Sequence, residues 1–261
     1  SLRIFGMVIF AIIGIFVIFG ISLNTVITFL GAITAVILLV FRDTILGFVT
    51  GIHVSTSKNL KIGDWIGIPK YNIEGNIQDI NLLTTKIVNF DKTISTIPTY
   101  DLLSTEIRNH QVMYEGSSRR IKRSIYFNIK SFKFVDDEFY EKVKDINLIS
   151  EYMDRKLREI AESKKNIPHA ERIINGQQLT NIGLFRNYVL NYLKNNPKVD
   201  QDEIVLVRQL EISPQGMPLE IYCFANKAEL VDYERIQADI FDHILTAAQE
   251  FDLEIMQVAK A

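Results

Sequence analysis

The chain has 261 residues, with 29 basic and 31 acidic side chains and a formal net charge of −2. This near-neutral balance gives no sign of polyanion binding, so we expect no nucleic-acid partner. The single cysteine, Cys223, excludes an internal disulfide and a cysteine zinc site, and its strand-like surroundings predict a position in a core.

The N-terminal region is apolar enough to lie in a membrane. Residues 4–41 contain no charged side chain. At about 1.5 Å of rise per residue, this run is too long for one crossing and fits two, with a break at Ser22-Leu23-Asn24. Because Ser1 already lies beside this apolar region, we expect further membrane helices ahead of it.

The flanking charges indicate the orientation of these helices. The turn at 22–24 has no Lys or Arg, whereas basic residues stand at the opposite ends of both helices, at Arg3, Arg42, Lys58 and Lys61. The positive-inside rule therefore places the large soluble part in the cytoplasm.

The second apolar segment carries small residues along one helical face. They recur with i, i+3, i+4, i+7 spacing at Thr28, Gly31, Ala32 and Ala35, and the same face continues through Leu38 and Leu39 to Arg42. Helices in lipid approach closely where the contact residues are small. This pattern fits a ring of copies around an axis. An ordinary membrane anchor with a chance run of small residues is the alternative.

The sequence after Arg42-Asp43 has a different character. Ile45, Phe48, Val49 and Ile52 predict one apolar face of a second helix, and Thr44, Gly47, Thr50 and Gly51 form its small or polar face. Asp43 is a suitable N-cap for that helix. We therefore expect a kink at Arg42-Asp43.

Short strands follow in residues 61–98. The runs KIGDWIGI, GNIQDINLL, TTKIVNF and TISTIP are separated by turn residues and predict a small barrel. Residues 101–108 predict a short polar helix or a loop. Trp65 is expected to fill the barrel rather than to anchor it at a membrane interface.

The remaining residues alternate between strands and helices. We predict strands at 121–129, 204–212, 219–224 and 254–258, and helices at 136–162, 182–195 and 231–251. Without the inserted helix this is the βαββαβ order of ferredoxin-like folds. A basic stretch precedes the first of these strands, at Arg119, Arg120, Lys122 and Arg123. A solvated linker and strand start is favoured there over an anion-binding site.

No motif for catalysis is present. The four histidines lack metal-ligand spacing, and there is neither a GxxxxGK[ST] phosphate loop nor a GxSxG nucleophile elbow. We therefore expect no catalytic residue, cofactor or metal. An RNA-binding module is a further alternative, but no run of stacking aromatic residues of the RNP type supports it.

Taken in order, these parts resemble the small-conductance mechanosensitive (MscS-like) channel family over nearly the whole chain. The similar stretches are LGA at 30–32, RDTILG at 42–47, GI at 51–52, KIGDWI at 61–66, GNI at 75–77, NLLTT at 81–85 and TIP at 96–98. Three later stretches, NIGLFR at 181–186, SPQGMPLEIY at 213–222 and QADIFDH at 237–243, resemble the miniconductance (YbdG-like) branch.

The resemblance implies a channel of the bacterial inner membrane that crosses the membrane more than once. Such a channel is a homoheptamer, and its partners are its own copies, lipids and permeating ions. It opens under tension to release ions and small solutes during hypoosmotic shock. The alternative is a membrane-anchored cytoplasmic signalling or enzymatic domain.

The resemblance also divides the chain and assigns roles. It implies a transmembrane helix (1–23), kinked pore-lining and amphipathic helices (24–58), an Sm-like β-barrel domain (59–112) and a C-terminal α/β domain (113–261). The implied constriction lies near Ala35 and Leu39, with Leu38 or Phe41 able to share it. Arg42 stands at the cytoplasmic end, Arg42 and Asp43 form the hinge, and Thr28, Gly31 and Ala32 pack the pore helices. Ala35 replaces a bulkier apolar residue of the family, and Asp43 replaces a glycine.

Overall fold

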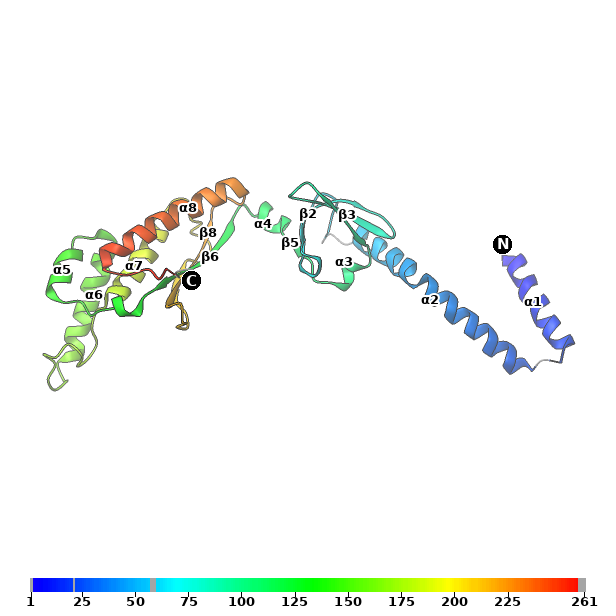
Figure 1. Cartoon of the computed structure of the whole chain (residues 1–261), viewed down its shortest axis with the longest axis horizontal. Coiled ribbons are helices and arrows are strands. Elements are labelled where there is room, and N and C mark those ends of the chain that lie inside the picture. The colour runs from blue at the N-terminus through cyan, green and yellow to red at the C-terminus, as the bar shows by residue number, and fades with distance from the viewer. Residues whose placement is uncertain (1, 21, 57–59, 258–261) are drawn as a thin grey trace. The chain divides into compact units, whose positions relative to one another are not determined.

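The computed structural model describes residues 2–20, 22–56 and 60–257 (Figure 1). Parts of the sequence-based predictions rest on Ser1, Lys58 and Val258. These three residues lie outside the described residues. The chain divides into two compact units, Ser1–Gln111 and Val112–Ala261.

Two helices begin the first unit. α1 spans Leu2–Ile18 and α2 spans Leu23–Thr56. The break between them overlaps the predicted one only at Ser22, because Leu23 and Asn24 already belong to α2. Gly20 has a φ of 68°, a conformation that costs glycine little because it has no Cβ. Ser22 starts α2, since its Oγ accepts a hydrogen bond from the Thr25 backbone N–H at 3.3 Å.

α2 continues without interruption through Arg42 and Asp43. The prediction that Asp43 caps a separate amphipathic helix is therefore wrong. No Gly or Pro occurs in residues 40–44, so nothing there removes or strains an i→i−4 hydrogen bond. With 34 residues, α2 is about 51 Å long.

A five-stranded antiparallel sheet completes the first unit. Its strands are β1 (Trp65–Ile68), β2 (Ile73–Ile80), β3 (Thr84–Asn89), β4 (Ile94–Pro98) and β5 (Arg108–Asn109), in the spatial order β4-β3-β2-β1-β5. The short helices η1 (Pro69–Tyr71) and α3 (Asp101–Ser104) connect strands. The core of the sheet consists of Ile66, Ile68, Ile77, Ile87, Ile97 and Leu102.

Trp65 lies outside this core, and the prediction that it fills a barrel is wrong. Successive residues of a strand point to opposite faces, and Ile66 and Ile68 take the buried face of β1. The Trp65 ring instead lies 4.9 Å from the His110 ring and 5.3 Å from the Phe90 ring. Its Nε1 donates to Glu74 at 3.1 Å.

The second unit contains a three-stranded antiparallel sheet in the order β6-β8-β7. The strands are β6 (Arg119–Phe127), β7 (Leu206–Gln209) and β8 (Met217–Ala225). A strand predicted at 254–258 is reduced to one antiparallel bridge between Ile255 and Phe127. Asn128 N donates to Glu254 O and Met256 N to Tyr126 O, so this segment still runs along the edge of β6.

Helices pack around this sheet. They are α5 (Asp137–Val143), α6 (Asn147–Lys164), α7 (Asn181–Lys194) and α8 (Leu230–Ala247), with η2 at Ile129–Ser131 and η3 at Ala248–Phe251. A further short helix, α4 (Gln111–Glu115), spans the boundary between the two units in the sequence. The helix predicted at 136–162 is therefore two helices. Ile146 adopts an extended conformation (φ −78°, ψ 105°) between them. Asp145 and Asn147, its neighbours, are weak helix formers.

The basic stretch lies in β6, which confirms that a strand starts there. Arg119 lies over the Tyr233 ring at 4.4 Å and Arg123 over the Phe241 ring at 5.0 Å. On the other face, Lys122 Nζ lies 3.8 Å from the buried Glu220. These contacts hold most of the stretch within the fold.

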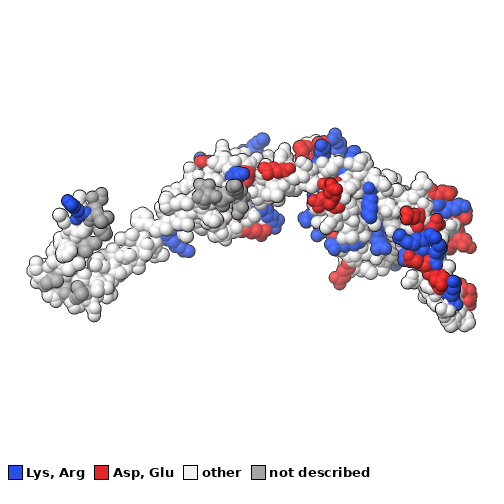
Figure 2. All heavy atoms as spheres, turned by 180° about the vertical axis from the view of Figure 1, so that it is seen from behind, with Lys and Arg blue, Asp and Glu red and all other residues white. Residues whose placement is uncertain are grey.

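Cys223 of β8 is fully buried, as predicted, and burial raises the pKa of its thiol to about 12. Charged side chains lie on the β-rich domain and on the second unit and are almost absent from the α1–α2 region (Figure 2).

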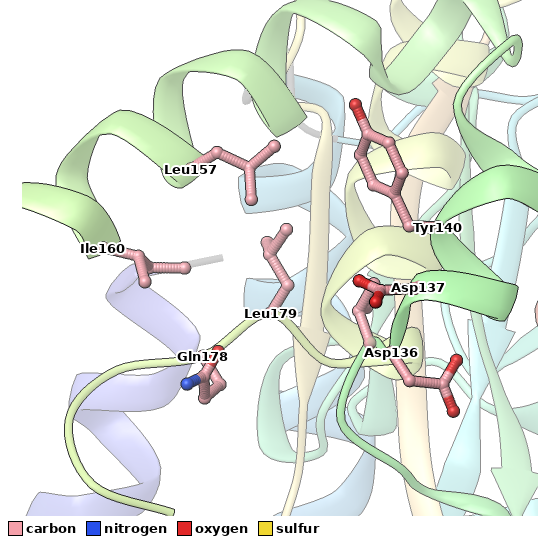
Figure 3. A pocket seen from close by; sticks show the side chains of 8 residues that line it. Asp136, Asp137, Tyr140, Leu157, Ile160, Gln178 and Leu179 are labelled. Atoms are coloured by element: carbon pink, nitrogen blue, oxygen red, sulfur yellow. The ribbon is translucent and has the colours of Figure 1, made fainter. Parts of the chain in front are cut away.

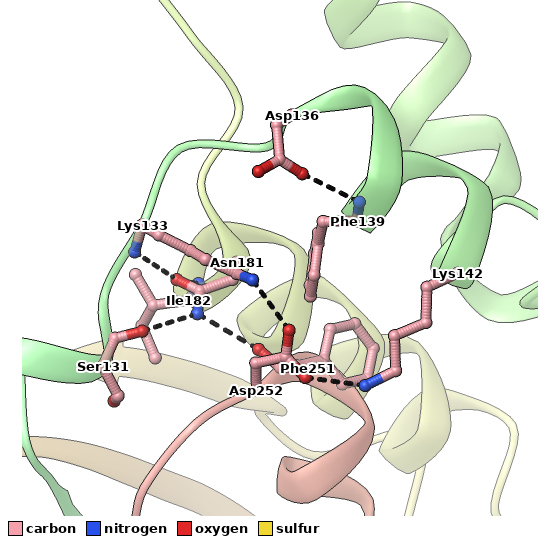
Figure 4. Close-up of polar contacts among 9 residues, drawn as sticks. All are labelled: Ser131, Lys133, Asp136, Phe139, Lys142, Asn181, Ile182, Phe251 and Asp252. Carbon is pink, nitrogen blue, oxygen red and sulfur yellow. Dashed lines mark hydrogen bonds and ion pairs between the residues drawn. The ribbon is translucent and has the colours of Figure 1, made fainter.

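Two features near α5 stand out in the second unit. One is a pocket between α5, α6 and the segment before α7 (Figure 3). The other is a polar network around the buried Asn181 (Figure 4). The Asn181 side chain donates to Ser131 O and Phe251 O and accepts from Lys133 N and Ile182 N. These bonds tie the start of α7 to the segments after β6 and after α8.

Candidate functional site

The most unusual surface of the chain is that of α2. One helix among the described residues, Asn24–His53, is long and apolar enough to cross a membrane. Residues 27–46 are exposed without exception, although most are large and hydrophobic. A soluble protein rarely leaves so large an apolar surface uncovered. This surface therefore requires lipid or other helices around it.

The residues of the small-residue stripe all lie on α2. Thr28, Gly31, Ala32 and Ala35 are exposed, and a Cβ added at Gly31 would meet nothing within 4 Å. The Thr28 hydroxyl donates to the Asn24 carbonyl at 2.8 Å, so it needs no outside partner. Leu38 and Leu39 continue the stripe and are 56% and 72% exposed. The structure thus places these residues on one open helix face.

Arg42 and Asp43 are also exposed, in the middle of the continuous helix. They are the only two adjacent charged residues in the described part of α2. Their role as a hinge stays a prediction.

The C-terminal part of α2 is seated against the β-sheet domain by its small face. Gly47 is buried, and a Cβ at this position would overlap the carbonyl oxygen of Leu82. Thr50, one turn further along, is only 3% exposed. The apolar face with Phe48 and Ile52 remains exposed. The close approach of α2 to the Leu82 backbone is possible because Gly47 has no side chain.

The loop that receives Gly47 is firmly held by the sheet. The Thr99 hydroxyl donates to Asn81 O at 2.7 Å, and its backbone N–H donates to Leu83 O at 3.0 Å. Thr99 is fully buried and lies 3.1 Å from the equally buried Thr85 hydroxyl. Asn81 and Leu83, which flank Leu82, are both hydrogen-bonded to Thr99. A displacement of α2 against Leu82 would therefore also displace this part of the β-domain.

This junction is the part of the site that sequence reasoning missed. The sequence places Gly47 and Thr50 on a small or polar face and indicates no partner for it. The available signal was the i, i+3, i+4 recurrence of Gly47, Thr50 and Gly51, which resembles the small-residue contacts of packed helices. Nothing in the sequence indicated that Leu82 would be the partner.

The described residues contain no group of three or more His, Cys, Asp or Glu side chains that could hold a metal ion. His243 accepts or donates a 2.7 Å hydrogen bond with the Tyr188 hydroxyl and stacks on Tyr192, at 4.2 Å between ring centroids. This histidine is part of an aromatic cluster in the C-terminal unit.

Two family models match successive parts of the chain. Residues 43–112 match the β-domain of mechanosensitive ion channels, and residues 155–255 match the C-terminal domain of the mechanosensitive channel MscS. The first match begins at Asp43 and so includes the junction at Gly47.

Relatives of known name agree with these matches. The low conductance mechanosensitive channel YnaI of Escherichia coli is 25% identical over 231 residues, which cover 88% of this chain and 53% of that protein. The small-conductance channel MscMJ of Methanocaldococcus jannaschii is 31% identical over 90 residues, 34% of this chain and 25% of that protein. The chain therefore spans about half the length of YnaI.

Solved structures show the same fold. MSL1 of Arabidopsis thaliana aligns over 92% of this chain and 68% of its own, with a TM-score of 0.60 and 15% identity. MscS of Helicobacter pylori in its closed state aligns over 93% of this chain and 74% of its own, with a TM-score of 0.54 and 16% identity. The apolar α2, the β-rich domain, the C-terminal domain and the two family matches together show that the chain belongs to the MscS family of mechanosensitive ion channels.

Proposed function

We propose that the protein is a mechanosensitive channel that opens under membrane tension and releases ions and small solutes during hypoosmotic shock. The observation that carries the proposal is the α2 surface, where a stripe of small residues lies exposed in the part of the chain that the structure describes. Copies arranged around an axis would bury this stripe and leave the bulky faces in lipid. A tethered enzyme or signalling domain would not need such a stripe.

The gate would be a ring of Leu39 side chains, with Ala35 and Leu38 beside it. A narrow apolar ring excludes water, so ions meet a dewetting barrier in the closed state. Tension favours the state that occupies more membrane area and thereby shifts a two-state population. Arg42 and Asp43 would serve as the hinge that lets the first part of α2 tilt. The tight contact between Gly47 and Leu82 would keep the second part seated on the β-domain.

The finer features of the assembly follow from the same proposal. About seven copies would form a closed ring in the bacterial inner membrane, each crossing it more than once. The five-stranded sheet would be an Sm-like barrel. The C-terminal unit would be ferredoxin-like, because its order β6-β8-β7 with Ile255 beside β6 is the order of that fold. We assign the chain to the miniconductance (YbdG-like) branch on the stretches at 181–186, 213–222 and 237–243.

Patch recordings of the full-length protein, from giant spheroplasts that lack other channels of this kind, test the function. The proposal expects openings whose probability rises with suction and whose conductance is below that of MscS recorded in parallel. Membranes that contain the protein but stay silent up to the lytic tension would contradict it.

A further inference from the structure

A pocket in the second unit is independent of the proposed pore. Its volume is about 250 Å³, and it lies between the start of α5, the middle of α6 and the segment that leads into α7 (Figure 3). The side chains that define it are Asp136, Asp137, Tyr140, Leu157, Ile160 and Leu179. This volume is sufficient for a small organic molecule rather than for a water or an ion alone.

One side of the pocket is apolar and preformed. Ile160 is 8% exposed and Leu179 is 7% exposed, and both belong to the hydrophobic core of the unit. Leu157, one turn before Ile160 on α6, is 38% exposed and extends this wall toward solvent. An aliphatic chain placed here would remove apolar surface from water on both sides of the contact.

The other side carries negative charge. Asp136 caps α5, because its Oδ1 accepts from Phe139 N at 2.8 Å. The Asp137 side chain is exposed, and its carboxylate has no hydrogen bond or ion pair with any residue that the structure describes. Figure 3 shows the Asp137 carboxylate turned toward Leu179, whereas that of Asp136 is turned away. Asp137 is therefore the carboxylate available to a ligand.

We propose that this pocket binds an alkylammonium ion. The ammonium group would donate to the Asp137 carboxylate, and the aliphatic chain would lie on Leu157, Ile160 and Leu179. An ammonium has three N–H donors, and the Asp137 carboxylate offers two acceptor oxygens.

Other ligand classes fit less well. Two carboxylates repel an anion. A neutral apolar molecule would desolvate Asp137 without supplying a donor. A metal ion would need more ligands, and the described residues offer no group of three acidic, histidine or cysteine side chains.

The test is ligand-observed saturation-transfer NMR with pentylammonium and the full chain in detergent. Pentanoate and pentan-1-ol serve as probes of equal chain length and different charge. The proposal expects saturable binding of pentylammonium, with transfer to its methyl end, and no saturable binding of pentanoate. It also expects pentan-1-ol to bind at least about tenfold more weakly, because a hydrogen bond to a charged group contributes roughly 1.5–3 kcal/mol.

Three variants locate the binding. Asp137→Asn should weaken pentylammonium binding at least about tenfold, and Leu157→Trp should abolish it by filling the pocket from its exposed edge. Glu138→Gln removes the same charge from the next position of α5, outside the lining, and should leave the affinity unchanged. Equal effects of Asp137→Asn and Glu138→Gln, equal binding of the three probes, or no saturable binding of pentylammonium would overturn the proposal.

Discussion

Leu39 and Val40 are neighbours on α2 with nearly equal exposure, 72% and 70%. Helical geometry turns them about 100° apart, so only Leu39 lies on the small-residue stripe. If the stripe lines the pore, a polar residue at Leu39 should wet the constriction and lower its barrier. Leu39→Ser is therefore expected to open at a lower tension than the unmodified channel in patch recordings.

Val40→Ser is the matched control for that experiment. It makes a similar change of polarity on a face that we expect to contact lipid, so its threshold should move less. An unchanged threshold for Leu39→Ser, or an equal shift for both variants, would speak against Leu39 as the gate.

Asp252 joins the end of the chain to the segment after β6. Its carboxylate accepts hydrogen bonds from Lys133 at 2.8 Å and from Lys142 at 2.7 Å (Figure 4). The Lys133 bond, followed by the Lys142 bond, lowers the pKa of Asp252. A lowered pKa means that these bonds stabilise the fold above the unfolded-state pKa of about 3.9. This stabilisation is lost as the pH falls through the folded-state pKa.

Asp252→Asn tests this stabilisation. Asp252 has a φ of 52°, a conformation that Asn also tolerates, so the backbone should not change. We expect a lower thermal midpoint for the variant at pH 7 and a smaller difference at about pH 3, which lies below the unfolded-state pKa. The group is partly exposed, so the effect should be modest. A difference that is the same at both pH values would contradict the role of the charge.

At the scale of elements, the junction between α2 and the β2–β3 loop gives the sharpest prediction. A Cβ at Gly47 would overlap the Leu82 carbonyl oxygen, whereas a Cβ at Gly51 would meet nothing within 4 Å. Gly47→Ala should therefore displace α2 from the loop and destabilise this contact by about 1–3 kcal/mol. Hydrogen exchange at residues 81–85 should become faster.

Gly51→Ala is the control for the junction. It adds the same methyl group to the same helix and raises helix propensity, so exchange at 81–85 should be unchanged or slower. Equal protection in both variants would show that the junction does not depend on close packing at Gly47.

Some of the helices and strands could be predicted from the sequence, and others could not. β8 and the turn before it were predictable because a nearly continuous apolar run directly follows the turn residues of 213–216. The break at Ile146 was not, since the apolar spacing of 136–162 suits one helix as well as two. Period-2 alternation could show that Trp65 and Ile66 point to opposite faces, but not which face is the core.

The candidate site was predictable to a similar extent. An apolar helix with a small-residue stripe follows from composition and spacing, and α2 carries both. The burial of Gly47 and Thr50 depends on Leu82, which is remote in sequence. Local signals suggested that Asp43 caps a helix, but an Asp inside a long helix costs too little to end it.

At the scale of the whole molecule, the account depends on copies of α2 standing side by side. The run 27–46 is exposed in the part of the chain that the structure describes. Lipid alone would satisfy its bulky residues, whereas the small stripe allows the backbone of another helix to approach closely and pack against it. The assembled state is therefore the property that separates a channel from a tethered soluble domain.

The most direct measurement is electron cryomicroscopy of the full-length protein in lipid nanodiscs. The account predicts a closed ring of about seven copies in which Thr28, Gly31, Ala32, Ala35, Leu38 and Leu39 face neighbouring copies or a central water path. A particle in which α2 helices stand apart in lipid, with no central opening between them, would contradict it.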